Sequence, residues 1–451
     1  MKLRTRYTLI ISLMATFTIV APLILLHASG YRYNFKKNIV EKTGIIYVNS
    51  EPPEAQVFVN GQWINEPAPV SVTRLLPEEY DIEIKLDGYL PWRKTLTVES
   101  GQTTFAKGVN LIKDTLPKLM IRHDITDSVF SQDGTTAVFV SSDDEWSDLM
   151  RYDFGTERTL SLAKFAADKY SRLELNMSPD GTQLLVNGKL KIDGNISVTL
   201  YDTDLTEASF EIPELAAATD MQYCWSDDSS LLIATPDKLS SVSEDRTIQT
   251  IFIAGQDAIK DVFCTSSYYW LLIDAEEGLQ LTRLDKNNPT LPETIATLTH
   301  RHRRFVDGKD DLLWLSGDSQ IGGLAINPQT GHSFRTPEVT KINWEFSDGN
   351  GRVLLSNDFE IFLIDFVRPE PELITRLGTP IESVAWHPNG SYALFATSTG
   401  ITAIELDNRD RRNIFRLVEF GTVETMSVNR ESNLIRFVGS IGNQRGIYER
   451  P

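Results

Sequence analysis

One short pattern recurs along the chain from about residue 127 onward and constrains the fold more than any other feature. It consists of a large apolar residue, then Ser or His, then a tight turn of acidic or amide residues that usually ends in Gly. An apolar run typical of a β-strand follows each copy at once. The clear copies are Phe130-Ser131-Gln132-Asp133-Gly134, Met177-Ser178-Pro179-Asp180-Gly181, Trp225-Ser226-Asp227-Asp228-Ser229, Phe346-Ser347-Asp348-Gly349 and Trp386-His387-Pro388-Asn389-Gly390. The pattern predicts a series of β-hairpins, and hence an all-β fold for this region.

Weaker copies of the pattern fill the remaining gaps. They open at Cys264, Val306 and Val428, and each precedes another apolar run. Together the copies give eight openings with roughly 42 residues to each repeat, the usual length of a propeller blade of four short strands. Residues 116–451 therefore predict a β-propeller of eight blades, with seven as the alternative if a weak copy is an insertion. The run Lys118–Arg122 precedes the first opening, and we expect it to pair with the last blade and close the ring.

The turn residues explain the pattern in structural terms. Asp, Asn and Gly supply the positive φ angles and local side-chain hydrogen bonds that a tight turn needs. We expect the large apolar residue before each turn to pack between neighbouring blades. The Ser-x-Asp-Gly motif, as at Ser131 and Ser178, resembles the repeats of TolB-type and WD-type propellers and of prolyl oligopeptidase relatives. The resemblance implies a structural repeat, because the hydrolase activity of the last group belongs to a separate domain that has no counterpart in this sequence.

Residues 1–30 have the composition of a membrane-spanning segment. Residues 7–26 form a run of about twenty residues without a charged side chain, long enough to cross a hydrocarbon layer of ~30 Å as a helix. Lys2, Arg4 and Arg6 precede it, which predicts a signal-anchor helix with the N-terminus inside and the later domains outside the cytoplasm. The alternative is a cleaved signal peptide with its small residues at Ala28-Ser29-Gly30, although the apolar region of a signal peptide usually spans only ~7–15 residues.

A small β-module is expected at residues 43–113. Apolar and polar side chains alternate strictly over residues 80–86, so we expect one face of that strand to be buried and the other to be exposed to solvent. Asn60-Gly61 is a strong hairpin dipeptide, and Asp87-Gly88 marks a second turn. The pattern predicts a small antiparallel β-sandwich.

The motifs of this module are similar to those of the PEGA domain. They are Pro52-Pro53-Glu54-Ala55, Val57-Phe58-Val59-Asn60-Gly61, Ala68-Pro69, Leu76-Pro77-Glu78-Glu79-Tyr80 and Gly88-Tyr89-Leu90-Pro91-Trp92. The sequence departs from the family where Glu54-Ala55 lacks an intervening Gly, and at Glu78-Glu79, where a Gly usually precedes the Tyr. In that family the domain is common on bacterial surface and envelope proteins and has no known catalytic residues. The resemblance implies a spacer or binding module close to a membrane anchor.

Charge argues against nucleic-acid binding. The chain has 44 Lys and Arg residues against 62 Asp and Glu residues, a formal net charge of -18. Such a balance repels phosphate backbones. The sequence therefore excludes a nucleic-acid partner for the body of the protein.

No constellation of catalytic or cofactor-binding residues is found in the sequence. The nearest approach to a G-x-S-x-G elbow, at residues 317–321, fails at its last position. The acidic loops at Asp143-Asp144 and Asp227-Asp228 lack the spacing of a calcium loop. We therefore assign no catalytic residue, cofactor or metal, and we do not expect an enzyme.

The two cysteines occupy equivalent places in adjacent repeats. Cys224 and Cys264 each precede an apolar Leu-Leu-Ile run by seven residues. Outside the cytoplasm a disulfide between them is possible, provided that their Cα atoms lie within ~7 Å of each other. A bridge and two buried free thiols remain equal alternatives from the sequence.

These observations suggest a membrane-anchored binding or scaffold protein of the bacterial cell envelope, whose propeller presents a surface to a protein or a glycan. One alternative is an extracytoplasmic hydrolase or lyase, for example a carbohydrate-active enzyme, that uses the propeller channel; another is a structural spacer without a ligand. Binding loops are expected where the repeats depart from their own pattern. The candidate residues are Asp143, Asp144, Trp146, Arg301, Arg303 and Arg304.

Overall fold

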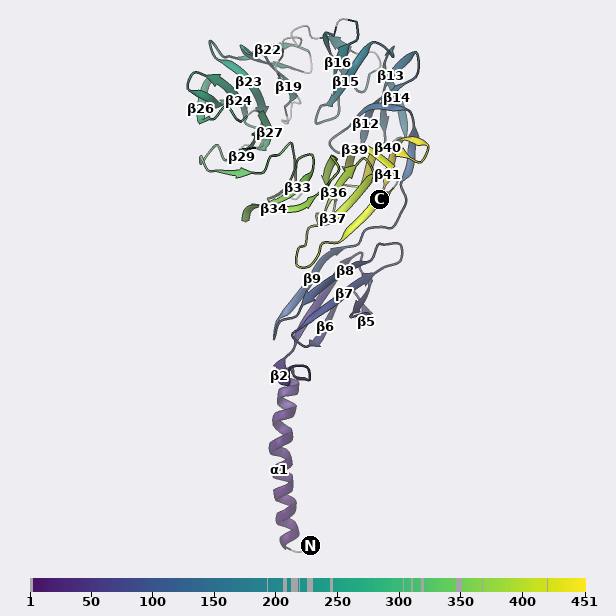
Figure 1. The fold of residues 1–451 in the computed structure, drawn as a ribbon, viewed down its shortest axis with the longest axis vertical. Coiled ribbons are helices and arrows are strands. Elements are labelled where there is room, and N and C mark those ends of the chain that lie inside the picture. Colours follow the sequence, from purple (N-terminus) through teal and green to yellow (C-terminus); the bar gives the residue numbers. More distant parts are fainter. Residues whose placement is uncertain are drawn as a thin grey trace. The chain divides into compact units, whose positions relative to one another are not determined.

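The computed structural model describes residues 3–192, 194–205, 209–211, 218, 220–224, 230–243, 246–302, 304–309, 311–317, 320–345, 351–366, 368–419 and 421–451. Its strands and one long helix form two compact units (Figure 1). The first unit contains Met1–Thr115 together with Ile404–Phe415, and the second contains Leu116–Ala403 and Arg416–Pro451. Each unit is described by itself below.

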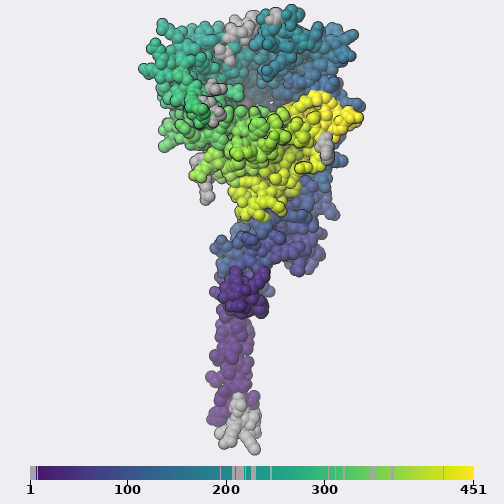
Figure 2. Space-filling view, in the orientation of Figure 1, coloured from purple at the N-terminus to yellow at the C-terminus, as the bar shows by residue number. Residues whose placement is uncertain are grey.

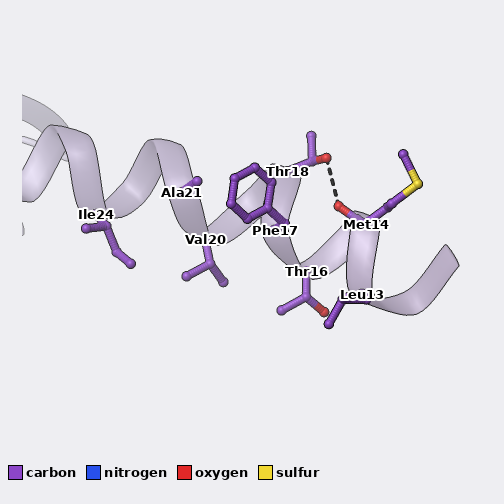
Figure 3. Close-up of a pocket in the computed structure, with 8 residues that line it drawn as sticks. All are labelled: Leu13, Met14, Thr16, Phe17, Thr18, Val20, Ala21 and Ile24. Atoms are coloured by element: carbon purple, nitrogen blue, oxygen red, sulfur yellow. Dashed lines mark hydrogen bonds between the residues drawn. The ribbon is translucent and has the colours of Figure 1, made fainter. Parts of the chain in front are cut away.

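The first unit begins with an apolar helix, α1 (Leu3–Ala28). Leu9–Ala28 has a mean hydropathy of 2.5 and is 0% buried, so this stretch is a candidate membrane span or signal anchor. Figure 2 shows that no other described part of the chain covers the middle of the helix. Apolar side chains from Leu13 to Ile24 project from it (Figure 3), and the Thr18 hydroxyl donates to the Met14 carbonyl oxygen at 2.8 Å. This bond satisfies the Thr18 hydroxyl within the helix itself.

A short hairpin follows the helix. Strand β1 (Tyr31–Asn34) pairs antiparallel with β2 (Ile39–Lys42), with Tyr33 opposite Val40. The Arg32 guanidinium donates to the carbonyl oxygen of His27 at 3.0 Å, so the hairpin is bonded directly to the last turn of α1.

The β-module of the first unit is a sandwich of two sheets. One sheet has the order β6-β3-β9 and the other the order β5-β4-β7-β8. The strands are β3 (Gly44–Glu51), β4 (Gln56–Val59), β5 (Gln62–Pro67), β6 (Val70–Leu75), β7 (Glu79–Lys85), β8 (Trp92–Thr97) and β9 (Thr103–Asn110). The predicted Asn60-Gly61 turn joins β4 to β5, and both residues have positive φ angles, of 49° and 76°.

The expectation of a wholly antiparallel sandwich was wrong in one respect. Strand β3 pairs with β9 in parallel, with Tyr47 opposite Phe105. A parallel pair needs a crossover connection, and here that connection runs through the second sheet. Local alternation of apolar and polar residues fixes which face of β9 is buried but not the direction of its partner.

The core of this sandwich is apolar and fully enclosed. Ile46, Val57, Ile82 and Ile84 are at most 1% exposed, and Trp92 lies among them at 1%. The segment Ile404–Phe415 belongs to this unit, although it comes from a distant part of the sequence. The domain boundaries expected from sequence place the same residues within the propeller region at 116–451.

The second unit consists of four-stranded antiparallel sheets arranged around a centre (Figure 1). The first four sheets contain β11 (Ile125–Phe130), β12 (Thr136–Ser142), β13 (Trp146–Asp153), β14 (Arg158–Ala166); β15 (Tyr170–Met177), β16 (Gln183–Leu190), β17 (Ile196–Asp202), β18 (Ser209–Glu211); β19 (Asp220–Tyr223), β20 (Leu231–Ala234), β21 (Lys238–Val242), β22 (Ile248–Ile253); and β23 (Ala258–Cys264), β24 (Tyr268–Ala275), β25 (Gly278–Asp285), β26 (Asn288–Leu298).

The next sheets repeat this order. They contain β27 (Arg304–Lys309), β28 (Leu312–Ser316), β29 (Gly323–Ile326), β30 (Ser333–Thr336); β31 (Lys341–Trp344), β32 (Arg352–Ser356), β33 (Glu360–Asp365), β34 (Arg368–Arg376); and β35 (Ile381–Trp386), β36 (Tyr392–Thr397), β37 (Gly400–Glu405), β38 (Ile414–Glu419). Across the described residues of 118–450 there are eight such sheets, one for each opening of the repeat.

The last sheet closes the ring, because it combines the first strand of the second unit with the last three. It has the order β10-β41-β40-β39, with β10 (Lys118–Arg122), β39 (Gly421–Asn429), β40 (Leu434–Ile441) and β41 (Gln444–Arg450). Strand β10 pairs antiparallel with β41, which confirms the expected closure by Lys118–Arg122. The strands β11, β15, β19, β23, β27, β31, β35 and β39, one from each sheet, are here called inner strands. Inner strands of neighbouring sheets contact each other, for example β23 and β27 or β35 and β39, and β11 contacts β39.

The turns of the repeat have the chemistry expected from the sequence where the structure describes them. The Ser131 hydroxyl donates to Asp133 at 2.6 Å and accepts the Thr136 amide at 2.9 Å. The copies at 225–229 and 346–349 lie outside the described residues. The weak copy at Val306 was placed wrongly, because Asp307 and Gly308 lie within β27 and the chain turns only after Lys309.

Candidate functional site: a cavity at the ends of the inner strands

A cavity of about 740 Å³ lies in the second unit where the inner strands end. The described residues that line it come from six sheets, at or just beyond the last residues of β11, β23, β27, β31, β35 and β39. Its charged lining side chains are Asp307, Lys309, Asp311, Glu345 and Arg430. Residues distant in the sequence meet here because each inner strand ends beside the next one around the ring.

Asp307 is an acid of this cavity that accepts two hydrogen bonds. Its Oδ2 accepts the indole N–H of Trp344 at 2.8 Å, and its Oδ1 accepts the Gly308 amide at 2.7 Å. Burial raises the pKa of Asp307 to about 6, while the two donors oppose that shift. Burial disfavours the charged carboxylate, whereas hydrogen bonds to the carboxylate favour it. Asp307 therefore changes charge near neutral pH, within a cavity large enough for a ligand.

Trp344 contacts two charged side chains along one edge of the cavity, Asp307 and Lys309. The Lys309 ammonium lies 4.5 Å from the centre of its indole ring, a cation–π contact. Because the Lys309 contact and the Asp307 bond come from one strand of the neighbouring sheet, Trp344 ties β31 to β27. The residue expected to pack between blades in this repeat, Phe346, lies outside the described residues.

Trp386 repeats this arrangement one sheet further on. It is 0% exposed, and its indole N–H donates to the Asn343 carbonyl oxygen at 2.8 Å. The Arg352 guanidinium lies 5.2 Å from the centre of the ring and donates to Glu345 Oε2 at 2.8 Å. Glu345 is thus engaged in an ion pair, which leaves Asp307, Asp311, Lys309 and Arg430 as the other charged groups at the cavity.

A row of carboxylates occurs at one register position of four successive inner strands. Asp127, Glu174, Asp220 and Asp261 each lie three residues before the last residue of their strand. Burial, followed by the charge of Asp220, with which Asp261 also shares a hydrogen bond, raises the pKa of Asp261 to about 8. Burial and the Glu174 charge also raise the pKa of Asp127. Among the described residues, no three His, Cys, Asp or Glu side chains are grouped to hold a metal ion.

The two cysteines are joined as a disulfide in the structure. Cys224 follows β19, Cys264 ends β23, and their Cα atoms are 5.2 Å apart. This separation is within the range that a disulfide needs. Cys264 also lines the cavity, so the bridge ties two inner strands together at its edge.

The acidic loop expected to bind a partner is a tight hairpin between β12 and β13. Asp143 Oδ1 accepts the amides of Glu145 at 2.9 Å and Trp146 at 2.6 Å, and the Trp146 amide lowers the pKa of Asp143 below its usual range. Asp144 is exposed beside it. The Trp146 ring is 45% exposed, with the Lys164 ammonium 5.4 Å from its centre. The carboxylate of Asp143 therefore stabilises the turn.

The basic candidates lie on another sheet, around the start of β27. Arg301 precedes that strand and donates to Gln320, and Arg304 is its first residue. Arg303 lies outside the described residues. The acidic hairpin belongs to the first sheet and these arginines to the fifth, so the structure does not unite the two groups into one site.

Sequence reasoning missed the cavity and its central acid. Asp307 was interpreted as a turn residue of a weak repeat, and Trp344 precedes a predicted turn without belonging to it. A comparison of equivalent strand positions would have found the row of carboxylates, because all four share one distance from the strand end. No local signal shows that Asp307 and Trp344, 37 residues apart in sequence, are hydrogen-bonded.

Comparisons with known proteins agree with this architecture. Residues 43–109 match the family model of the PEGA domain. Among solved structures, dihydro-heme d1 dehydrogenase NirN in complex with DHE is similar with a TM-score of 0.50 and 17% identity, over 73% of this chain and 76% of that one. The C-terminal WD40 domain of Sif2 gives a TM-score of 0.49 and 13% identity over 75% and 99% of the two chains.

The Dos1 propeller gives a TM-score of 0.49 and 15% identity over 74% of this chain and 93% of that chain. No curated protein matches the sequence. Identities this low concern the fold alone. The chain therefore carries an apolar N-terminal helix, a PEGA domain at residues 43–109, and a ring of four-stranded sheets that is a β-propeller.

Proposed function

We propose that this chain is a single-pass protein of the bacterial cytoplasmic membrane, with its N-terminus inside and its PEGA domain and propeller outside the cytoplasm. The observation that supports this most directly is the stretch Leu9–Ala28 of α1, twenty residues with a mean hydropathy of 2.5 and no buried part. Twenty residues at a rise of ~1.5 Å each match a hydrocarbon layer of ~30 Å. The PEGA domain begins at residue 43, after the fourteen residues 29–42 that follow the helix, as expected of an envelope module close to its anchor.

In this proposal the propeller is a binding or scaffold module, and its cavity receives the partner. The cavity presents acids at Asp307 and Asp311 and cations at Lys309 and Arg430. Charged groups of both signs beside Trp344 suit a polar partner, either an extended protein segment or a glycan. Asp143, Asp144, Trp146, Arg301 and Arg304 are proposed as secondary contacts, because their side chains are exposed. Arg303 lies outside the described residues. No enzymatic step is proposed for this module.

Two experiments test the proposal. Alkaline phosphatase fused after residue 451 is active only if that end lies outside the cytoplasm, and an N-terminal tag retained on the full-length protein shows an uncleaved anchor. A photo-cross-linking residue at Asp311 should give a discrete adduct in intact cells. The same residue at Leu291, an exposed position in β26, is the matched control. No adduct at either position favours the structural spacer.

A second candidate function is supported by Asp307. A carboxyl with a pKa raised to about 6 in a cavity is able to donate a proton near neutral pH, which is a requirement for a hydrolase or lyase acting in the channel. Purified protein would then degrade a polymeric glycan, and Asp307→Asn would abolish this activity while Asp311→Asn would not. Equal turnover by both variants would exclude Asp307 as the acid.

A further inference from the structure

The hairpin of β1 and β2 has two different faces. Because residues alternate along a strand, Tyr31 and Tyr33 share one face with Val40, which lies opposite Tyr33. Tyr33 is 46% and Val40 is 54% exposed, and Phe35 at the turn is 84% exposed. Phe35 packs edge-on against Tyr33, with ring centres 4.9 Å apart. An aromatic and apolar face is therefore open to its surroundings.

The opposite face of the hairpin has polar groups that are bonded within the first unit and one apolar residue, Ile39, which is 47% exposed. Asn34 is 1% exposed and donates to Glu41 at 3.0 Å. At the turn, Lys36 pairs with Glu78 at 3.0 Å, and the Lys37 ammonium donates to the Pro77 carbonyl oxygen at 3.4 Å. These bonds attach the turn of the hairpin to the sandwich, whereas the aromatic side chains of the first face remain exposed.

The position of the hairpin in the chain indicates what covers its aromatic face. The apolar stretch of α1 ends at Ala28, and β1 begins at Tyr31. The bond from Arg32 to His27 keeps the hairpin against the last helical turn. If α1 spans the membrane, the hairpin starts where hydrocarbon gives way to headgroups. Tyr and Trp rings concentrate at this depth because one part of the ring is apolar and another is wet.

We propose that the β1–β2 hairpin is a membrane-interface foot, whose Tyr31, Tyr33, Phe35 and Val40 lie in the headgroup layer of the outer leaflet. The inference rests on the proposed membrane anchoring by α1. The foot gives the PEGA domain a second attachment to the bilayer beside the helix, through Lys36–Glu78 and the bonds of Thr43 to the Gly30 carbonyl oxygen. The partner of this surface is lipid, and the alternative is a second protein.

The test uses the full chain in vesicles of phosphatidylethanolamine and phosphatidylglycerol. Single cysteines at Tyr33, Phe35, Leu13 and Leu291 are labelled with an environment-sensitive fluorophore, and the unsubstituted chain serves as the labelling blank. Nitroxide-bearing lipids then quench the fluorophore at a shallow or a deep position in the bilayer. We expect the labels at 33 and 35 to lose most of their emission to the shallow nitroxide. The label at 13 should respond to the deep nitroxide, and the label at 291 to neither.

Each other outcome overturns a defined part of the inference. Quenching at 13 without quenching at 33 and 35 leaves the anchor intact and rejects the foot. Blue-shifted emission at 33 and 35 that no nitroxide quenches indicates a protein partner, and also rejects the foot. Absence of quenching at all positions rejects the anchor, and the foot with it.

Discussion

The ammonium of Lys94 lies 2.9 Å from the carboxylate of Glu405, and the two side chains are 0% and 7% exposed. Both residues belong to the first unit, although 311 positions separate them in the sequence. Lys94 also donates to the Asp407 carbonyl oxygen at 2.8 Å, and the Trp92 indole donates to Glu405 Oε1 at 2.8 Å. Every strong polar group in this cluster thus has a partner, as a buried charge requires.

Removing the cation should therefore cost far more than removing an exposed one. Lys94→Met leaves the Glu405 carboxylate buried without its counter-ion, for which we expect a loss of about 3–5 kcal/mol in the unfolding free energy of the first unit. The measurement is denaturant unfolding of the detergent-solubilised chain. Lys85→Met is the control, because Lys85 pairs with Glu83 but is 44% exposed, and an exposed pair contributes about 1 kcal/mol or less. Equal losses in both variants would show that the Lys94 pair is not buried.

Asp261 should make the propeller less stable as the pH rises. Its pKa of about 8 in the folded state exceeds that of an ordinary Asp, so the folded state binds its proton more tightly than the unfolded state does. The contribution of the protonated Asp261 carboxyl to the stability of the second unit is therefore fully present below pH ~4, and it is lost progressively as the pH rises to ~8. The groups that face Asp261 are Asp220, Arg304 and the Phe305 amide.

Asp261→Asn should remove this dependence, because Asn keeps an acceptor for the Phe305 amide and cannot ionise. We expect the melting temperature of the variant to exceed that of the original chain at pH 9 and to equal it at pH 4. Asp143→Asn serves as the control, since the pKa of Asp143 is lowered and its carboxylate is exposed. A constant difference between Asp261→Asn and the original chain at all pH values would contradict the assignment.

Local chemistry explains why the hairpins were predictable from sequence and the sites were not. Gly134 and Gly181 have φ angles of 68° and 75°, which a side chain disfavours, so the turn sequence itself dictates the turn. Closure of the ring by Lys118–Arg122 was also predictable, because a blade that lacks a strand leaves an exposed edge. The packing of Ile404–Phe415 in the first unit depends on a contact between segments some 300 residues apart, and no local pattern encodes it.

The environment of Asp307 was hidden for a related reason. In sequence, Asp307-Gly308 has the composition of a turn, yet the bulge between Phe305 and Asp307 places it within a strand. Its pKa and its bond to Trp344 depend on the neighbouring sheet. For the two cysteines, the repeat itself showed that Cys224 and Cys264 occupy equivalent positions. The distance between them could not be predicted, because it depends on the spacing of the strands around the ring.

The disulfide should stabilise the propeller through the unfolded chain. Cys224 and Cys264 are 40 residues apart, and closing a loop of that length is worth about 4 kcal/mol in the chain-entropy description. We expect the variant with both cysteines changed to Ser to lose a similar amount in denaturant unfolding of the second unit. Alkylation under denaturing, non-reducing conditions followed by mass spectrometry should find no free thiol in the original chain. Two alkylated cysteines would contradict the bridge.

Trp344 should stabilise the charged form of Asp307 specifically. Trp344→Phe keeps most of the ring but removes the indole N–H that donates to Asp307 Oδ2. A hydrogen bond to the carboxylate favours ionisation, so its loss should raise the pKa of Asp307 above about 6. The lost stability, about 1–3 kcal/mol for a buried acceptor deprived of a donor, should appear mainly above that pKa, where Asp307 is charged.

The measurement is denaturant unfolding of the second unit at pH 5 and at pH 8. We expect a small penalty for Trp344→Phe at pH 5 and the full penalty at pH 8. Trp146→Phe is the matched control, because Trp146 is 45% exposed on the β12–β13 hairpin and should cost little at either pH. Equal penalties for Trp344→Phe at the two pH values would mean that the ring packs between the blades without acting on the charge of Asp307. Asp307 would then owe its pKa to burial, the Gly308 amide and the charge of Lys309.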